Sequence, residues 1–104
     1  MYYVYMLRCE NNSIYTGIAK DLERRMREHF SQDEKCAKYT KAHKPKKLEM
    51  AWETENKSLA SKLEYAIKSL DKAKKEELIQ KPKLLNELLG ERIEPSLYKI
   101  DKCI

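Results

Sequence analysis

The sequence predicts a small α/β (α+β) domain in which a three-stranded antiparallel or mixed sheet carries flanking helices. Its 104 residues suffice for one domain with one core. Apolar side chains alternate with polar ones in three segments, as in strands, and recur every three or four residues in others, as in helices. These segments follow the order β-β-α-β-α-α without a βαβ crossover pattern, so an antiparallel or mixed sheet is favoured.

The first two elements are predicted strands that form a β-hairpin. Residues 3–8 alternate between two faces and are rich in aromatic and β-branched side chains, and residues 13–19 form a second run of this kind. Glu10-Asn11-Asn12 lies between the two runs and has the polar residues that turns favour. We therefore expect the two runs to pair.

A helix and a long loop are predicted after the hairpin. Asp21 is a good N-cap, and Leu22, Met26 and Phe30 recur every four residues after it. This spacing predicts an amphipathic helix that ends near Phe30. Residues 31–47 show no periodicity, and we expect them to form a loop.

A third strand and two more helices complete the predicted order. Alternation returns over residues 48–53 and predicts the strand. Ser58 is expected to cap a helix with one apolar face, and Asp71 to cap a short helix that runs through Ile79.

The last quarter of the chain is predicted to be a helical appendage. Pro82 suits a helix start, a stripe of leucines follows it, and Gly90 and Pro95 mark the end. We therefore divide the chain into a domain at residues 1–80 and an appendage at residues 81–104 that packs on the same domain.

Net charge, apolar runs and cysteines indicate which partners and which cellular location to expect. Lys and Arg outnumber Asp and Glu by 22 to 17, and the net charge of +5 suggests an anionic partner, although such a charge is also common in proteins that bind nothing acidic. No apolar run approaches the roughly 20 residues that cross a bilayer, which predicts a cytoplasmic protein without a membrane partner. Cys9, Cys36 and Cys103 are odd in number and widely spaced, which fits neither a disulfide framework nor a paired zinc-ligand pattern, so we expect reduced thiols and no disulfide-linked partner.

Four side chains in the predicted hairpin and first helix are candidates for chemistry. The hairpin brings Tyr5 and Tyr15 within a few residues of each other, although cross-strand tyrosines also simply stabilise hairpins. Arg25 and His29 are four residues apart and are expected at the rim of the core, where Arg can bind phosphate and His can transfer a proton. The alternative for both is a solvated helix face.

Two further features suit a nucleic-acid substrate. Glu64 lies at the edge of an apolar helix stripe, where a carboxylate can bind a hard divalent cation or can simply face water. The predicted loop is basic and contains Tyr39, which suits a phosphate backbone and a stacked base, or is an ordinary solvated loop. Its candidate nucleic-acid-binding residues are Lys38, Lys41, Lys44, Lys46 and Lys47.

The order and spacing of these residues resemble the GIY-YIG nuclease superfamily over residues 2–79. Tyr3-Val4-Tyr5 stands for the first motif and Tyr15-Thr16-Gly17 for the second, although Gly and Ile are missing from the first. The string from Tyr15 to His29 is similar to the small stand-alone bacterial (UPF0213-like) members. The structural residues of the two motifs are Tyr3, Val4, Thr16 and Gly17.

The resemblance implies a role for each matching position. Glu64 matches the metal-binding glutamate, which implies a single Mg²⁺ or Mn²⁺ ion. A downstream polar residue that is often Asn in the family has no counterpart that we can place. The residues implied to be catalytic are Tyr5, Tyr15, Arg25 and His29, with Tyr39 as an additional active-site residue.

The resemblance further implies a metal-dependent endonuclease that hydrolyses phosphodiester bonds. A tyrosine would position or deprotonate the attacking water, and we favour Tyr5 over Tyr15. DNA is favoured over RNA, with DNA structure or damage as the cue, which suggests a role in DNA repair. The sequence does not decide whether the chain also forms a weak homo-oligomer. The alternative is a nucleic-acid-binding module of the same fold with little catalysis of its own.

Overall fold

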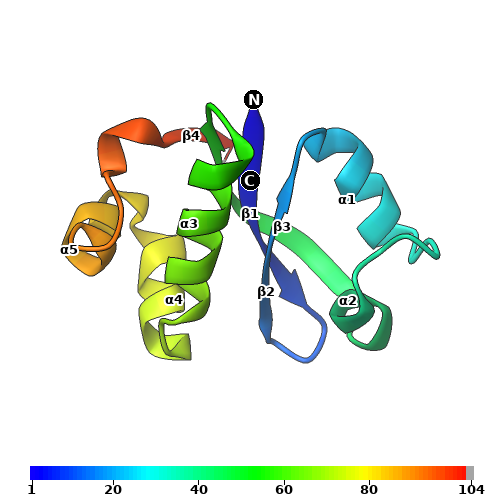
Figure 1. The fold of residues 1–104 in the computed structure, drawn as a ribbon. Coiled ribbons are helices and arrows are strands. Elements are labelled where there is room, and N and C mark those ends of the chain that lie inside the picture. The colour runs from blue at the N-terminus through cyan, green and yellow to red at the C-terminus, as the bar shows by residue number, and fades with distance from the viewer. Residues whose placement is uncertain (103–104) are drawn as a thin grey trace.

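The computed structural model describes residues 1–102, apart from the side chain of Lys102, and contains a four-stranded antiparallel sheet (Figure 1). The expectation for the Cys103 thiol lies outside the described residues. The strand order is β2-β1-β3-β4, and each neighbouring pair is antiparallel. The strands are β1 (Tyr2–Cys9), β2 (Ile14–Ala19), β3 (Pro45–Thr54) and β4 (Lys99–Lys102).

The predicted antiparallel sheet is confirmed, but the prediction of three strands is wrong. β4 comes from the C-terminal segment and pairs with β3 at the edge of the sheet. It has four residues, and its apolar side chain, Ile100, is exposed. Such a short edge strand is held by backbone hydrogen bonds to its neighbour and leaves no alternating pattern in the sequence.

The helices α1 (Leu22–Phe30), α3 (Lys57–Lys68) and α4 (Lys72–Gln80) match the three predicted helices. The Asp21 carboxylate accepts from the Arg24 backbone N–H, and Asp71 caps α4 in the same way. The predicted Ser58 cap of α3 is wrong, because the Asn56 side chain accepts from the Leu59 N–H at 2.9 Å. The helix therefore begins two residues earlier than predicted.

The predicted loop over residues 31–47 contains a helix and the start of a strand. α2 (Lys38–Ala42) is a single turn without a side-chain cap, and β3 already begins at Pro45. One helical turn is too short to show a period of 3.6 residues. Lys38 and Lys41 therefore lie on α2, Lys46 and Lys47 lie on β3, and Lys44 lies between these elements.

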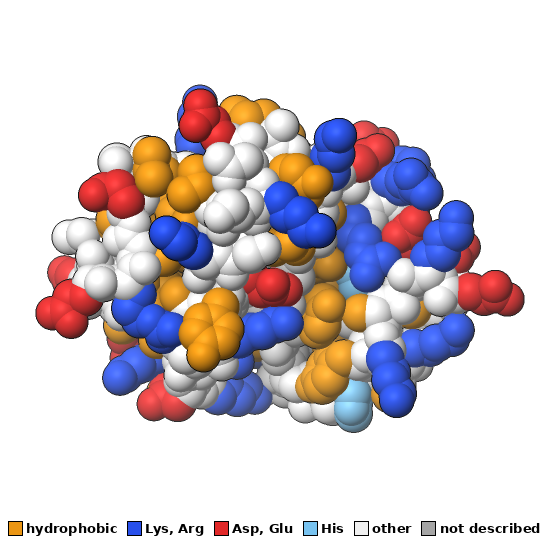
Figure 2. Space-filling view, in the orientation of Figure 1, with side chains coloured by type: hydrophobic (Ala, Val, Ile, Leu, Met, Phe, Trp, Pro, Cys, Tyr) orange, Lys and Arg blue, Asp and Glu red, His pale blue; other side chains and the backbone are white. Residues whose placement is uncertain are grey.

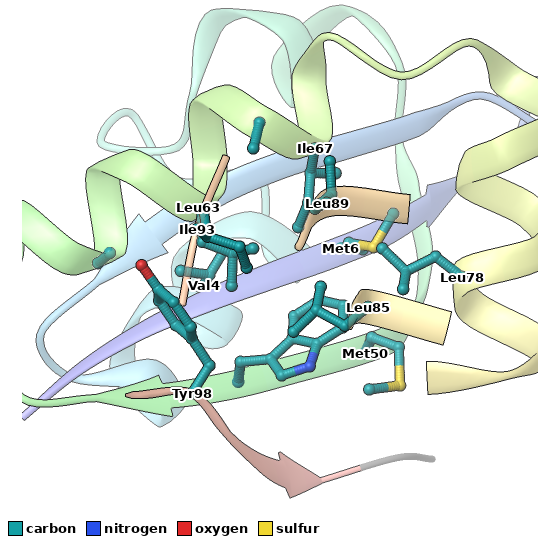
Figure 3. Close-up of a cluster of buried hydrophobic side chains, with 13 residues drawn as sticks. Val4, Met6, Met50, Leu63, Ile67, Leu78, Leu85, Leu89, Ile93 and Tyr98 are labelled. Atoms are coloured by element: carbon teal, nitrogen blue, oxygen red, sulfur yellow. The ribbon is translucent and has the colours of Figure 1, made fainter. Parts of the chain in front are cut away.

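Two layers of helices cover the two faces of the sheet. α3, α4 and α5 (Leu85–Leu89) lie on one side of the strands, and α1 and α2 lie on the other (Figure 1). The larger core joins the first helix group to the sheet, and Figure 3 shows its side chains converging from strands and helices. Its main members are Val4, Met6, Met50, Trp52, Leu63, Ile67, Leu78, Leu85, Leu89, Ile93 and Tyr98.

The C-terminal segment belongs to this larger core. It runs through two short 3₁₀ turns, Pro82–Leu84 and Pro95–Leu97, on either side of α5. Leu85, Leu89 and Tyr98 are buried against the sheet, and the Tyr98 hydroxyl donates to the Leu59 carbonyl at 2.6 Å. The division of the chain at residues 80 and 81 stays a prediction. Among the described residues, no helix is long and apolar enough to cross a membrane.

The smaller core lies under α1 and differs from the predicted helix stripe. Leu22 and Met26 pack against Tyr5 and its neighbours on the sheet, as expected. Phe30, however, is 38% exposed, and His29 is fully buried in its place. Both sets of residues, 22, 26 and 29 and 22, 26 and 30, lie on one face of a helix. The prediction chose Phe30 as the buried residue because phenylalanine is more hydrophobic than histidine.

Candidate active site

The hairpin register places two tyrosines on one face of the sheet. Tyr5 pairs with Gly17, and Leu7 pairs with Tyr15, so Tyr5 and Tyr15 are diagonal neighbours across β1 and β2. Their ring centroids are 6.3 Å apart. The prediction that the two rings meet across the hairpin is therefore confirmed.

Gly17 makes room for the Tyr5 side chain. A methyl group at residue 17 would lie 2.5 Å from the Tyr5 hydroxyl oxygen and 2.7 Å from its Cζ atom, well inside van der Waals contact. The backbone at this position is ordinary strand, so close approach is what requires glycine. The glycine of the second motif thus lets the Tyr5 ring cross over β2.

His29 is the buried centre of the cluster. Its Nε2 atom lies 2.7 Å from the Tyr5 hydroxyl, and its Nδ1 atom lies 2.8 Å from the Thr40 hydroxyl. Burial, aided by the positive charge of Arg25, lowers the pKa of His29 to about 4. The imidazole is therefore neutral at physiological pH. Its predicted place at the rim of the core is wrong, because the whole side chain is enclosed.

Tyr15 faces outward from this centre and is flanked by two helices. Its ring lies 5.6 Å from His29, and Tyr39 of α2 stacks on it with centroids 5.8 Å apart. Tyr39 in turn contacts the His43 ring at 4.6 Å. From the other side, the Lys68 ammonium of α3 lies 5.8 Å from the Tyr15 centroid. Tyr15 and Tyr39 are partly exposed, so this part of the cluster can meet a ligand.

Arg25 lies at the rim, as predicted for that residue. Its Nη1 atom donates to Glu28 Oε1 at 2.8 Å and to the Lys35 carbonyl at 2.6 Å. Burial raises the pKa of both Tyr5 and Tyr15, and the guanidinium charge of Arg25 opposes this effect at each phenol. Arg25 is thus close enough to the tyrosines to act on the same ligand.

Glu64 faces the cluster from α3. Its Oε2 atom lies 3.3 Å from the Lys68 ammonium, and its side chain is 24% exposed. Burial raises the pKa of both tyrosines, and the negative charge of Glu64 adds to this effect. Over the described part of the chain, no three His, Cys, Asp or Glu side chains gather into a metal-binding group.

A single carboxylate fits the way in which proteins hold Mg²⁺ or Mn²⁺ together with a phosphate substrate. Mg²⁺ keeps several waters and takes one or two carboxylates plus phosphate oxygens. Glu64 can supply that one protein ligand if Lys68 gives up its ion pair. The residues present therefore fit a divalent ion that a nucleic acid helps to bind, rather than a closed metal site.

The other motif residues have structural positions. Val4 is buried in the larger core, and Tyr3 is half-buried beside a groove along α1. Thr16 is buried on the sheet face opposite to Tyr15, and its hydroxyl has no hydrogen-bond partner among the described residues. None of these three side chains is part of the tyrosine–histidine cluster.

The five lysines predicted to bind nucleic acid are all exposed. Lys46 and Lys47 line the groove along α1 together with Arg24, and Lys47 pairs with Glu49 at 3.4 Å. Figure 2 shows Lys and Arg side chains over α3 and over α1 and α2, with apolar and carboxylate side chains between them. A polyanion can therefore contact lysines on either side of the cluster.

Two residues of the cluster were missed by sequence reasoning. Lys68 lies one helical turn after Glu64 on the same face of α3, so its spacing of four residues could have indicated it. Thr40 lies in the segment without periodicity, and its sequence position gives no sign that it reaches a histidine eleven residues away.

The fold and the site together are those of a GIY-YIG type of catalytic domain. The fold is a four-stranded antiparallel sheet with helices on both faces, and the site has two motif tyrosines over a glycine, with an arginine and a glutamate beside them. Residues 1–77 match the family model of the GIY-YIG catalytic domain, and the chain belongs to this family of nucleases. GIY-YIG nucleases generally use a divalent metal ion.

Several bacterial proteins of the UPF0213 group resemble this chain. A UPF0213 protein of Fusobacterium nucleatum is 53% identical over 81 residues, which cover 78% of this chain and 79% of the relative. One of Vibrio campbellii is 47% identical over 77 residues, which cover 74% of this chain and 72% of the relative. The solution NMR structure of a UPF0213 protein from Bacillus halodurans is similar with a TM-score of 0.50 at 40% identity, covering 77% of this chain and 84% of that one.

Proposed function

We propose that this protein is a metal-dependent endonuclease that hydrolyses phosphodiester bonds in DNA. The observation that carries the proposal is the convergence of Tyr15, Arg25, Glu64 and Lys68 around one partly exposed surface. These groups come from β2, α1 and α3. They combine a phenol, two cations and a carboxylate, which is the set that phosphodiester hydrolysis needs for positioning and for neutralising charge.

The cations of the site stabilise the phosphate. Arg25 presents a planar guanidinium whose N–H groups match phosphate oxygens, and Lys68 adds a mobile positive charge. Glu64 would hold a single Mg²⁺ or Mn²⁺ ion, which supplies Lewis-acid stabilisation of the phosphate and of the leaving oxygen when bound. Negative charge that develops on the phosphate would thus meet positive charge from two helices.

Tyr15 is the better candidate to orient and deprotonate the attacking water. Tyr5, which the sequence favoured, has no exposed surface, and its hydroxyl is engaged with His29. Tyr15 is partly exposed, and although burial raises its pKa, the charges of Lys68 and Arg25 oppose this and favour the phenolate form. We therefore assign the base to Tyr15 and a supporting place to Tyr5 and His29, with Tyr39 stacking on the ring of the base.

The surroundings of the site suit contacts to a backbone more than to bases. The exposed lysines on α2 and β3 are flexible point charges that can follow phosphates irrespective of sequence. This supports recognition of DNA structure or damage, as in DNA repair, over recognition of a long sequence.

A binding module with little catalysis is the second candidate. The observation that favours it is the ion pair of Glu64 with Lys68, and no group of three His, Cys, Asp or Glu side chains forms a metal site among the described residues. If this pair persists when nucleic acid is bound, Glu64 is neutralised and holds no cation.

Cleavage of labelled substrates decides between the two candidates. The purified chain is incubated with duplex, single-stranded, flap and junction DNA, and with the matching RNA, in Mg²⁺, Mn²⁺ or chelator. We expect metal-dependent cleavage that Glu64→Gln abolishes, while Glu77→Gln, at an exposed position of α4, retains it. Metal-independent binding without cleavage would favour the module, and wild-type turnover by Glu64→Gln would refute the role of Glu64.

A further inference from the structure

A chain of hydrogen bonds leads from the Tyr5 hydroxyl to the backbone at the start of α2. The Tyr5 hydroxyl, the two ring nitrogens of His29, the Thr40 hydroxyl and the Ala37 carbonyl follow one another at 2.7, 2.8 and 3.0 Å. Tyr5, His29 and Thr40 have no exposed surface. We propose that Thr40 is a positioning residue that fixes the tautomer of His29, so that its Nε2 atom accepts the proton of the Tyr5 hydroxyl.

The direction of each hydrogen bond follows from the single proton on Thr40. The Thr40 hydroxyl donates that proton to the Ala37 carbonyl, since a carbonyl can only accept. Toward His29 the hydroxyl oxygen must therefore accept, so the Nδ1 atom of His29 carries a hydrogen. A neutral imidazole has one N–H, which leaves a lone pair on Nε2. The Tyr5 hydroxyl, 2.7 Å away, must then be the donor.

Two features keep this arrangement unique. Burial excludes water, so no solvent molecule can replace a partner that is missing or wrongly oriented. The lowered pKa of His29 keeps the imidazole neutral, whereas a protonated ring would donate from both nitrogens and would force the Tyr5 hydroxyl to turn away. Both features support a fixed tautomer at neutral pH.

The consequence for catalysis rests on the proposed function. With its proton committed to His29, the Tyr5 hydroxyl presents only acceptor lone pairs on its other side, toward Arg25 and Tyr15. The Tyr5 ring is also held over Gly17, where it supports Tyr15. Thr40 would thus act on the reaction through two other side chains, from α2, without touching the substrate.

A purely structural role for Thr40 is the competing explanation. Its hydroxyl bonds to the carbonyl three residues earlier, a local contact that also stabilises a single helical turn. In that case the loss of the hydroxyl would loosen α2 but would not change which nitrogen of His29 carries the hydrogen.

Nitrogen-15 NMR of the histidine rings distinguishes the two explanations. In the wild-type protein at pH 7.5, two-bond proton–nitrogen correlations are expected to show His29 in the Nδ1–H form. Thr40→Val should convert most of it to the Nε2–H form or to a mixture, while Thr40→Ser should retain the wild-type pattern. Thr54→Val is the matched control, because Thr54 is also buried and its hydroxyl donates to the Leu97 carbonyl.

Each result bears on the proposal. An Nε2–H or charged His29 in the wild-type protein would overturn it, as would an unchanged Nδ1–H form in Thr40→Val. If Thr40→Val does not fold, Thr40→Ala tests the same loss of the hydroxyl, and an unchanged Nδ1–H form in that variant would overturn the proposal. Where cleavage is measurable, Thr40→Val should reduce it about tenfold, equivalent to one lost buried hydrogen bond, and Thr40→Ser should restore it. The NMR result stands even if the protein cleaves nothing.

Discussion

The replacement of Gly17 by alanine should damage the fold and the site together. The new methyl group would lie 2.5 Å from the Tyr5 hydroxyl oxygen, 2.7 Å from Tyr5 Cζ and 3.0 Å from Tyr15 Cε2. Carbon atoms in good contact are about 3.5 to 4.0 Å apart, so the Tyr5 ring must move by roughly 1 Å. That shift is enough to break its 2.7 Å hydrogen bond to His29.

The expected cost combines two known effects. Forcing an extra methyl into a filled core costs about 1 to 3 kcal/mol, and losing a buried hydrogen bond costs about 1 kcal/mol more. The free energy of unfolding should therefore fall by about 2 to 4 kcal/mol. For a domain of this size, this corresponds to a decrease in Tm on the order of 10 to 25 °C.

Urea and thermal unfolding, followed by circular dichroism, measure this cost in a double-mutant cycle. Tyr5→Phe removes the atom that clashes most severely and breaks the hydrogen bond to His29 in advance. Gly17→Ala should therefore cost about 1 kcal/mol less in the Tyr5→Phe background than in the wild type. A cost below about 0.5 kcal/mol in the wild type, or an equal cost in both backgrounds, would refute the reasoning.

Three further predictions concern charge. The pKa of folded His29 is about 4, below its ordinary 6.5, so its contribution to stability is complete above pH 6.5 and is lost as the pH falls toward 4. In urea unfolding, the free energy of unfolding should fall by about 1 kcal/mol between pH 7.5 and 5.5, and His29→Gln should remove this dependence on pH. Arg25→Lys keeps the charge but loses the planar guanidinium, so single-turnover cleavage should fall far more than affinity does, and equal losses would reduce Arg25 to a phosphate anchor. A triple variant with Gln in place of the exposed Lys41, Lys44 and Lys46 should reduce the slope of log affinity against log salt on duplex DNA by up to about 3, with little change in cleavage at saturating protein. An unchanged slope in anisotropy titrations would mean that these side chains do not contact phosphate.

The sequence alone was sufficient for the main elements and for the family. Alternation marked β1, β2 and most of β3, and the Asp21 and Asp71 caps marked where α1 and α4 begin. The two tyrosine motifs, with Arg25 and Glu64 at their spacings, indicated the GIY-YIG domain that the comparison with the family confirms. These features are local, because periodicity, capping and motif spacing depend on neighbours along the chain.

The tertiary structure decided what depends on contacts between distant segments. It buried His29 instead of Phe30, added β4 to the sheet edge, and folded the turn that carries Thr40 against α1. Hydrophobic periodicity predicts that a phenylalanine is buried in preference to a histidine. It does not take into account that the two ring nitrogens of His29 form hydrogen bonds with side chains of β1 and α2. A buried polar side chain is stable only when the folded chain supplies those partners, so its place follows from the assembled structure rather than from any one segment.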